Sequence, residues 1–195
     1  PLYRRLRHLS PAEFGAFLRI GGGRAVLSVS PELFLRVIEG GLVETHPIKG
    51  TRRRGETEEE DRELANQLLK SEKDRAELAM IVDVSRNDLA RVCEVGSVRV
   101  REHAQLMTLP TVHHTVSIVQ GKLRSNATVM DLLRASFPAA SITGAPKIEA
   151  MKAAAREEGI RRGPSMGAIG WMALDGRLEL SVAIRTAFTD AGRVF

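Results

Sequence analysis

Short apolar runs rich in β-branched residues, bounded by glycine and proline, predict strands in the first fifty residues of this chain. Glu39-Gly40-Gly41 separates two of these runs and predicts a hairpin turn. Pro47 restricts the backbone and Gly50 permits a tight turn, so we expect Lys49 on a short, stiff segment after the third strand. These predicted strands cover residues 24–30, 33–38 and 42–48.

Helix start signals alternate with the strand pattern. Ser10-Pro11-Ala12-Glu13 is a capping box with proline at the first helical position, and Thr57 with Glu60 forms a second one. Thr128 is a third cap, and Ser71 marks a candidate break within the second helical region. The predicted helices cover residues 11–18, 58–89 and 129–133, and a fourth begins at residue 147.

The β pattern returns in the second half of the chain. His113 and His114 are adjacent within one strand, so their side chains must point to opposite faces of a sheet. Asp190-Ala191-Gly192 predicts a turn with almost no chain after it, and a hairpin without a return strand would leave an unpaired edge. We therefore expect the chain to stop inside its domain. The later strands are predicted around residues 95–100 and over 111–119, 166–173 and 180–188.

The alternation of both patterns predicts one domain over residues 1–195. It belongs to the α/β class in its α+β form, with antiparallel sheets flanked by helices. The chain has 195 residues, of which 43% are hydrophobic, enough for a substantial core. No apolar run approaches the roughly 20 residues that span a bilayer, and no leader is evident, so we expect a cytoplasmic protein without a membrane partner.

A formal net charge of +5 allows nucleic acid as a partner. The arginines are interleaved with acidic residues, and only one Trp and one Tyr are present for base stacking. An anionic small substrate explains the excess equally well, so a basic nucleic-acid-binding fragment is kept only as the non-enzyme alternative. The single cysteine, Cys93, lies in an apolar pattern and is expected to be an inert packing residue.

Lys49 admits two interpretations from its neighbours alone. It could be a solvated lysine on a strand-ending turn, or an amine prepared to act as a nucleophile. Arg52, Arg53 and Arg54 follow it closely, and positive charge near an ammonium favours the neutral, nucleophilic form.

Seven motifs, in order along nearly the whole chain, resemble those of the chorismate-utilising enzymes, a family that includes the aminodeoxychorismate, anthranilate, isochorismate and salicylate synthases. Any one of them alone would be weak, but their order is specific. They are Ser30-Pro31-Glu32, Pro47-Ile48-Lys49-Gly50-Thr51, Lys73-Asp74-Arg75-Ala76-Glu77, Asp83 with Arg86-Asn87-Asp88, His113-His114-Thr115-Val116-Ser117, Ser141-Ile142-Thr143-Gly144-Ala145-Pro146-Lys147, and Ile184-Arg185-Thr186.

Two of these motifs favour one branch of the family. Anthranilate synthases resemble Pro-Ile-Ala-Gly-Thr at the second motif, whereas a lysine there, Lys49 in this chain, is typical of the branch that forms aminodeoxychorismate. The loop that begins at Ser141 is also closer to that branch. The resemblance thus implies amination of chorismate at C4 with ammonia from a glutamine amidotransferase subunit, in p-aminobenzoate and folate biosynthesis. Anthranilate and isochorismate synthases are the alternatives.

The resemblance also implies roles for particular side chains. Glu32 would be the general acid, Lys49 the nucleophile at C2 of the ring, and His114 a catalytic group that approaches the ring. Glu77 would be a ligand of Mg2+, which is the expected cofactor. The residues expected to bind substrate are Thr51, Ser141, Gly144 and Arg185.

Two departures from the family pattern qualify this resemblance. Relatives carry an aromatic residue shortly after Arg-Gly, but this chain has Arg162-Gly163-Pro164-Ser165. The N-terminal portion of the family fold, and a later helix with a second metal-binding glutamate, have no counterpart here. We therefore expect a fold that is incomplete at both ends, with half of the metal site outside this sequence, and a fragment that is inactive alone.

Overall fold

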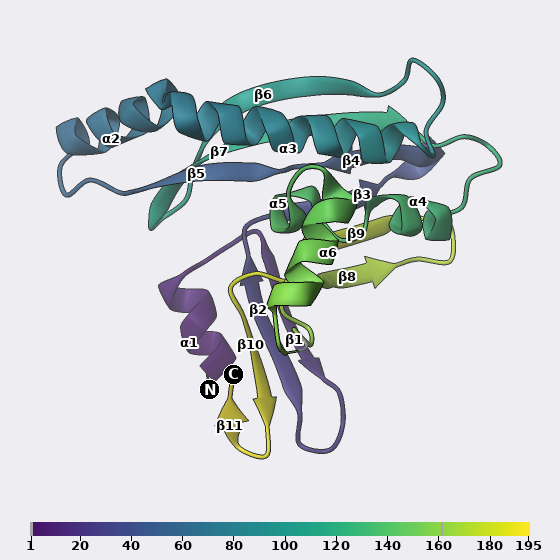
Figure 1. Cartoon of the computed structure of the whole chain (residues 1–195). Helices are drawn as coiled ribbons and strands as arrows, with labels where there is room; N and C mark the ends of the chain where they lie inside the picture. The colour runs from purple at the N-terminus through teal and green to yellow at the C-terminus, as the bar shows by residue number, and fades with distance from the viewer. Residues whose placement is uncertain (1, 161) are drawn as a thin grey trace.

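The computed structural model describes residues 2–160 and 162–195, whose strands form two antiparallel sheets (Figure 1). The helices are α1 (Leu2–Leu9), α2 (Glu58–Lys70), α3 (Glu72–Ala90), α4 (Val129–Ser136), α5 (Ala140–Thr143) and α6 (Lys147–Glu157), with a 3-10 turn η1 (Glu39–Gly41). The strands are β1 (Phe14–Arg19), β2 (Ala25–Ser30), β3 (Leu33–Val37), β4 (Leu42–Thr45), β5 (Ile48–Arg53), β6 (Arg99–Thr108), β7 (Val112–Lys122), β8 (Ala168–Met172), β9 (Leu178–Val182), β10 (Thr186–Asp190) and β11 (Arg193–Val194).

The larger sheet has seven strands and is built around β7. Strand β6 pairs along one edge of β7, while β5 and β4 lie end to end along the other edge. Strands β3, β9 and β8 continue the sheet beyond β4. The long helices α2 and α3 cover one face of this sheet, as Figure 1 shows. The core between these layers includes Leu78 and Val82 from α3 and Val43 and Val119 from the sheet.

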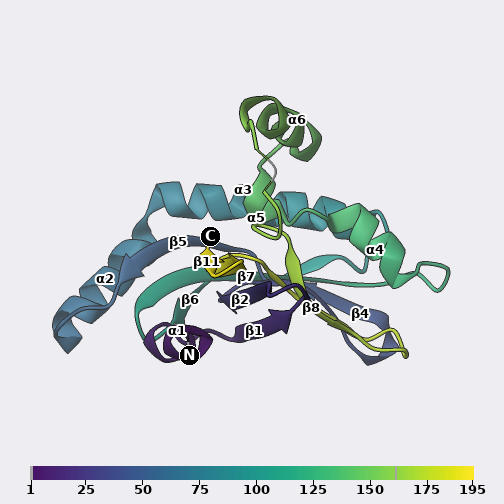
Figure 2. The same cartoon turned by 90° about the horizontal axis from the view of Figure 1, so that it is seen from below.

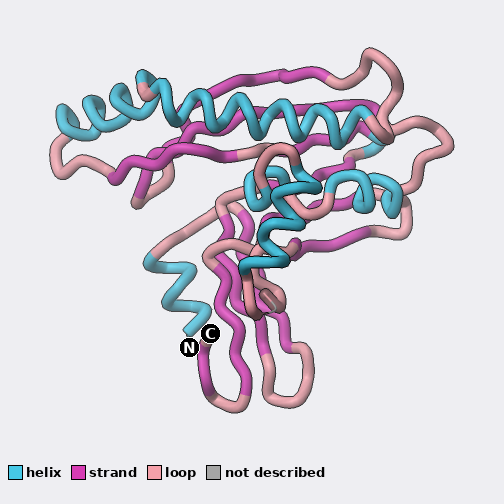
Figure 3. Tube along the Cα trace, in the orientation of Figure 1, coloured by secondary structure: helices cyan, strands magenta, loops and turns pink. Residues whose placement is uncertain are grey.

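The smaller sheet has the order β1-β2-β10-β11 and extends away from the larger one (Figure 3). The chain passes between the sheets twice, from β2 to β3 and from β9 to β10. Helix α6 has no buried residue, and the view from below shows most of it projecting away from the sheet (Figure 2). Within the described ranges, none of the helices combines the length and apolar character needed to span a membrane.

The helix caps predicted from the sequence are confirmed at three positions. Thr57 Oγ1 accepts a hydrogen bond from the Glu60 amide at 3.2 Å and starts α2. Ser71 separates α2 from α3 and caps the second of them. Thr128 forms a complete capping box with Asp131 at the start of α4. Each side chain satisfies an amide that the helix itself leaves without a partner.

The helix predicted over residues 11–18 is wrong. Residues Leu2–Leu9 form a helix instead, and Phe14–Arg19 form β1, which pairs with β2 without a register break. Gly21, Gly22 and Gly23 all have positive φ, so the glycine run makes the turn of a hairpin rather than ending a helix. The backbone hydrogen bonds offered by β2 override the local capping signal.

Four predictions about strands also need correction. The strand over 42–48 breaks at His46-Pro47, and the chain resumes as β5, so Lys49 lies within a strand rather than on a turn. The strand over 180–188 is two strands in different sheets, separated at Arg185, which has φ +48°. The last turn does have a return strand, the two-residue β11, which pairs with β10. The strand expected around 95–100 is the longer β6.

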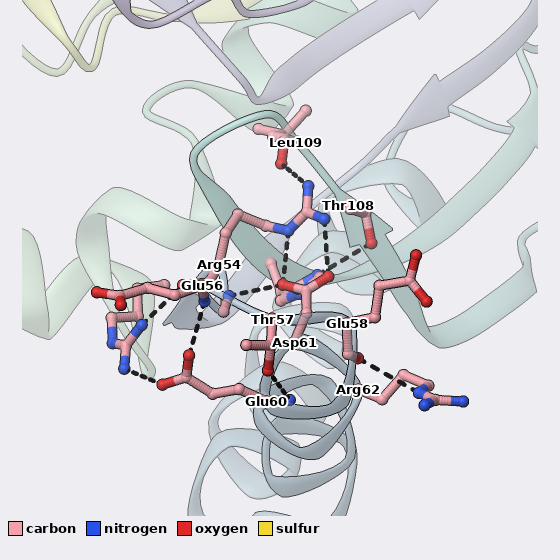
Figure 4. Close-up of polar contacts among 12 residues, drawn as sticks. Arg54, Glu56, Thr57, Glu58, Glu60, Asp61, Arg62, Thr108 and Leu109 are labelled. Carbon is pink, nitrogen blue, oxygen red and sulfur yellow. Dashed lines mark hydrogen bonds and ion pairs between the residues drawn. The ribbon is translucent and has the colours of Figure 1, made fainter.

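A network centred on Asp61 ties α2 to the large sheet (Figure 4). Asp61 accepts hydrogen bonds from Arg54 Nε and Nη2 at 2.8 and 2.7 Å and from the Gly55 amide at 2.8 Å. Its Oδ1 also lies 2.9 Å from His113 Nε2. These bonds, led by Arg54, hold the pKa of the Asp61 carboxyl well below its usual range. His113 thus faces the helices and has a structural role, as alternation with His114 predicts.

Gly50 should tolerate alanine poorly because of packing as well as backbone conformation. Its φ is +78°, and an added Cβ would lie 2.8 Å from Leu68 Cδ1 and 3.1 Å from Asp74 Cβ. Gly96 is a matched control, since its φ is +81° and an added Cβ would meet nothing within 4 Å. We expect Gly50→Ala to lower the free energy of unfolding by about 1–3 kcal/mol more than Gly96→Ala, measured by urea denaturation. Equal losses would show that only the backbone conformation matters.

Candidate active site

The site is organised by a bulge in the pairing of β5 with β7. Lys49 is opposite Thr115 and Thr51 is opposite His114, so Gly50 is an extra residue between two consecutive pairs. If all three residues were paired regularly, Gly50 would be opposite His114, and Thr51 would be opposite His113, whose side chain is on the other side of the sheet. The bulge therefore places a threonine hydroxyl beside the histidine that points away from the helices.

An acid, an amine and a serine meet beside this bulge. Lys49 Nζ donates a hydrogen bond to the Ser141 carbonyl at 3.3 Å, which joins β5 to α5 across 92 positions of sequence. Glu32, at the start of β3, is 5% exposed and lies within the influence of both residues. The Ser141 hydroxyl is buried and has no hydrogen bond of standard geometry among the described residues. It lies close enough to the Glu32 carboxyl to act on its pKa.

Burial raises the pKa of the Glu32 carboxyl from 4.5 to about 7. The Ser141 side chain, the backbone of Ile48 and the charge of Lys49 each oppose this rise, in that order. Desolvation wins because ionisation would place a charge where little water reaches it. Glu32 can therefore keep a proton near neutral pH, as a general acid must.

His114 is held in one tautomer by its neighbours. Its Nδ1 lies 3.1 Å from the Gly50 carbonyl, which can only accept, and 3.0 Å from Thr51 Oγ1. Its Nε2 lies 3.1 Å from Arg185 Nη2, which can only donate. We assign the proton to Nδ1 from these contacts. Burial, with the charges of Arg185 and His113, lowers the pKa of His114 against the opposing effect of the Gly50 carbonyl, so the ring is neutral.

Arg185 brings a guanidinium to this ring from the crossing between β9 and β10. Its φ of +48° is rare for a residue with a side chain and costs of order 1–3 kcal/mol. The backbone there is fixed by a hydrogen bond of 3.1 Å from the Val29 amide to the Arg185 carbonyl. The residue is exposed, so the rest of its planar fork can bind a carboxylate.

The structure brings six of the residues predicted from the sequence into two groups, although their roles stay predictions. Glu32, Lys49 and Ser141 form one group, and Thr51, His114 and Arg185 form the other. The two groups are joined along β5, on either side of Gly50. The contacts of two further predicted residues link them to neither group. Among the described residues Glu77 makes one ion pair, with Lys73 at 3.9 Å on the same helix. Gly144 ends α5, and a Cβ there would touch only Ala150 within 4 Å.

The arginines after Lys49 are engaged by the helices. Each is paired with a carboxylate of α2 or α3, so their charges are compensated. The pairs are Arg52 with Asp74, Arg53 with Glu60, and Arg54 with Asp61. Cys93 is buried as predicted, and burial raises the pKa of its thiol to about 11, which makes it inert at neutral pH.

The described residues supply at most part of a magnesium site. No group of three or more His, Cys, Asp or Glu side chains within residues 2–160 and 162–195 is arranged to hold a metal ion. Mg2+ keeps several waters and often takes only one or two protein carboxylates together with substrate oxygens. Glu77, with a side chain 43% exposed, fits such a role as a single ligand.

Comparison with known proteins assigns the fold and the family. The model for chorismate binding enzymes matches residues 1–195. The chain belongs to this family. The resemblance inferred from the seven motifs is confirmed.

Relatives in the chorismate-binding family carry more than one name. An aminodeoxychorismate synthase from Streptomyces griseus is 50% identical over 192 residues, which are 98% of this chain and 26% of that protein. An anthranilate synthase component 1 from Aquifex aeolicus is 44% identical over 186 residues, 95% of this chain and 37% of that protein. The crystal structure of anthranilate synthase component I from Streptococcus pneumoniae has a TM-score of 0.88 at 38% identity, covering 98% of this chain and 42% of that one.

This member of the family therefore spans between about a quarter and two fifths of the length of the relatives it matches. The predicted class is antiparallel sheets with flanking helices. It agrees with the structure of this chain and with its similarity to the solved structure. Overall similarity does not separate aminodeoxychorismate from anthranilate synthesis, because proteins with either name match almost the whole chain.

Replacing Glu32 by Gln should change how stability depends on pH. The folded-state pKa is about 7 against 4.5 for the unfolded chain, so the folded protein binds the extra proton between these values. The stability from this group is full below pH 4.5 and falls by roughly 3 kcal/mol as the pH rises past 7. Urea denaturation from pH 4 to 8 should show Glu32→Gln gaining that amount relative to wild type. A difference that stays constant with pH would contradict a buried, protonated Glu32.

Proposed function

We propose that this chain forms the chorismate-aminating site of an aminodeoxychorismate synthase, component I, which replaces the C4 hydroxyl of chorismate by an amino group. The observation that carries this proposal is the amine of Lys49, held 3.3 Å from the Ser141 carbonyl beside the buried acid Glu32. An acid that keeps its proton and an amine that can attack are the two groups this substitution needs. The product is 4-amino-4-deoxychorismate, a precursor of p-aminobenzoate and folate.

In the first step the amine of Lys49, once it has given up its proton, forms a bond to C2 of the ring. The ring double bonds shift and the C4–oxygen bond breaks, with Glu32 giving its proton to the departing hydroxyl, which leaves as water. The acid lowers this barrier because hydroxide is a poor leaving group. The Thr115 hydroxyl donates to the Lys49 carbonyl and fixes the backbone from which the amine extends.

In the second step ammonia forms a bond to C4, the double bonds shift back, and the C2–nitrogen bond to Lys49 breaks. The nitrogen now on C4 gives a proton back to the Glu32 carboxylate, so both the acid and the lysine are regenerated, and the enolpyruvyl group of chorismate is retained throughout. Two displacements thus replace one difficult substitution. The ammonia would come from a glutamine amidotransferase subunit, the partner expected from the family.

Arg185, His114 and Thr51 are positioned to bind and orient the substrate. The guanidinium of Arg185 offers paired donors for one of the two chorismate carboxylates. The neutral ring of His114 is fixed by Gly50 and Thr51, so it presents a defined face and edge beside that carboxylate. The buried hydroxyl of Ser141 lies beside Glu32 and can stabilise its carboxylate after the proton has left.

We also propose that Mg2+ acts with this site and that Glu77 supplies one of its ligands. When bound, magnesium would neutralise charge on a substrate carboxylate. The remaining ligands would be water and substrate oxygens, together with any carboxylate beyond the described residues.

Anthranilate and isochorismate synthesis are the competing activities in this family. The lysine at position 49 argues against the first, because the covalent route needs an amine at that position. Isochorismate synthesis would instead add water to the ring at C2. The three products have different masses, and only anthranilate formation releases pyruvate.

Replacing Lys49 by Ala tests the covalent route in the protein that carries this chain, supplied with chorismate, magnesium and an ammonium salt. We expect kcat for aminodeoxychorismate to fall by at least 100-fold, with KM little changed, because Glu32 and Arg185 still bind substrate. Mass spectrometry of the product and steady-state kinetics measure both.

Lys70→Ala is the control for Lys49→Ala, since Lys70 is exposed at the end of α2. It should leave kcat and KM unchanged. Undiminished formation of aminodeoxychorismate by Lys49→Ala would rule out the covalent mechanism. Release of pyruvate with an aromatic amine by wild type would instead overturn the proposed reaction.

Magnesium should bind weakly to this chain by itself, because a single carboxylate with water is a poor site for an ion that dehydrates reluctantly. Calorimetric titration should show tighter binding when chorismate is present, and Glu77→Gln should abolish that gain. Glu72→Gln, on the same helix, is the control and should not. Tight binding without chorismate, unaffected by Glu77→Gln, would assign the metal to other residues.

A further inference from the structure

Lys147 is a largely enclosed lysine that the proposed reaction does not use. It begins α6, yet its ammonium turns inward and lies 2.5 Å from Asp88 Oδ2, near the end of α3. It also donates to the carbonyls of Ser136 and Pro138, both at 2.7 Å. The side chains of Lys147 and Asp88 are only 13% and 7% exposed. The sequence motif contains this lysine but gives no reason to expect it in the interior.

The three contacts satisfy the ammonium completely. A lysine has three N–H donors, and here each has its own acceptor: one carboxylate and two backbone carbonyls. Burying an ion pair is costly unless the geometry is good and further hydrogen bonds complete it. Asp88 shows that cost, since burial raises the pKa of its carboxyl despite the bond from Lys147. A simple stabilising role could be filled by apolar residues at lower cost.

The placement of the two carbonyls indicates what this arrangement does. Ser136 ends α4 and Pro138 lies two residues later, on the segment that leads into α5. Ser141 follows on α5, where its carbonyl accepts from Lys49 Nζ and its hydroxyl is buried beside Glu32. Lys147 itself closes the segment from the other end. One ammonium therefore fixes both ends of residues 136–147 against α3, with Ser141 between them.

We propose that Lys147 is a positioning residue that holds residues 136–147 so that Ser141 meets Lys49 and Glu32. It does not touch the substrate, and it acts through the carbonyls of Ser136 and Pro138. The effect on catalysis rests on the proposed function. The effect on Glu32 does not, because it concerns the local geometry alone.

A lysine that served stability alone would give a different pattern from a positioning lysine. Restoring stability without restoring the carbonyl contacts separates the two roles. Lys147→Met leaves Asp88 buried without a partner, and Asp88→Asn in the same chain removes that charge. The double variant should recover most of the lost stability, and it remains informative if Lys147→Met alone does not fold. Neither variant can hold the two carbonyls with three donors.

Two measurements test the proposal in the protein that carries this chain. The first is steady-state kinetics with chorismate, magnesium and an ammonium salt. We expect kcat to fall by about 10- to 100-fold in both Lys147→Met and the double variant, with KM changed less than about threefold, since small displacements of reacting groups are costly. Lys152→Met is the matched control on α6, because Lys152 is exposed and its one ion pair among the described residues is with Glu149. It should change neither constant.

The second measurement is the titration of Glu32, followed by carbon NMR with Glu32→Gln for assignment. The titratable group that faces Glu32 is Lys49, from β5. Displacement of Ser141 should admit water and move the pKa from about 7 toward 4.5 in both Lys147 variants, because desolvation is the largest cause of the shift. Lys152→Met should leave it unchanged.

The outcomes separate this proposal from the proposed function. If the double variant recovers stability together with wild-type kcat and the wild-type titration of Glu32, Lys147 is only a structural anchor and the proposal fails. If the Glu32 titration moves while wild type makes no aminodeoxychorismate, Lys147 still positions this site, and the proposed reaction is the part that is wrong.

Discussion

The pairing of β5 with β7 is the constraint on which the rest of the site depends. One inserted residue, Gly50, shifts the register so that Thr51 is opposite His114 rather than His113. The same glycine lets the strand approach Leu68 and Asp74, where a Cβ would not fit. The packing of Leu68 and Asp74 against β5 therefore requires glycine at the bulge, and the bulge places Thr51 on the same side of the sheet as His114. The carbonyl that the bulge exposes also fixes the tautomer of His114, so a single backbone irregularity determines both geometry and protonation.

Charge in this region is distributed unevenly. The arginines of β5 are matched with carboxylates of α2 and α3, and these pairs hold the layers together. Glu32, in contrast, is buried with one nearby amine and keeps its proton because water is excluded. The proposed function needs an acid and a nucleophile to coexist where few other charges compete. Compensation of the arginines would help to leave that chemistry to Glu32 and Lys49.

Much of this could be predicted from the sequence, and the failures have common physical causes. Motifs located six residues of the site, and caps such as Thr57 and Thr128 located helix starts, because these signals are local. The capping box at residues 10–13 predicts a helix where β1 lies, because it is a local signal. Pairing with β2, which comes later in the chain, outweighs that signal. The crossing at Arg185 was missed because a positive φ on arginine has no sequence signature. The buried pair of Lys147 with Asp88 joins residues 59 positions apart, which no periodic pattern can show.

The site is assembled from segments that have little else in common. Glu32 comes from the start of β3, Lys49 from β5, Ser141 from α5 and Arg185 from the crossing between the two sheets. Such a scaffold can be retained while one side chain changes, which is why relatives with different names match almost all of this chain. In the proposed function, the reaction depends on the side chain at position 49, because only an amine can form the covalent bond that the proposed amination requires.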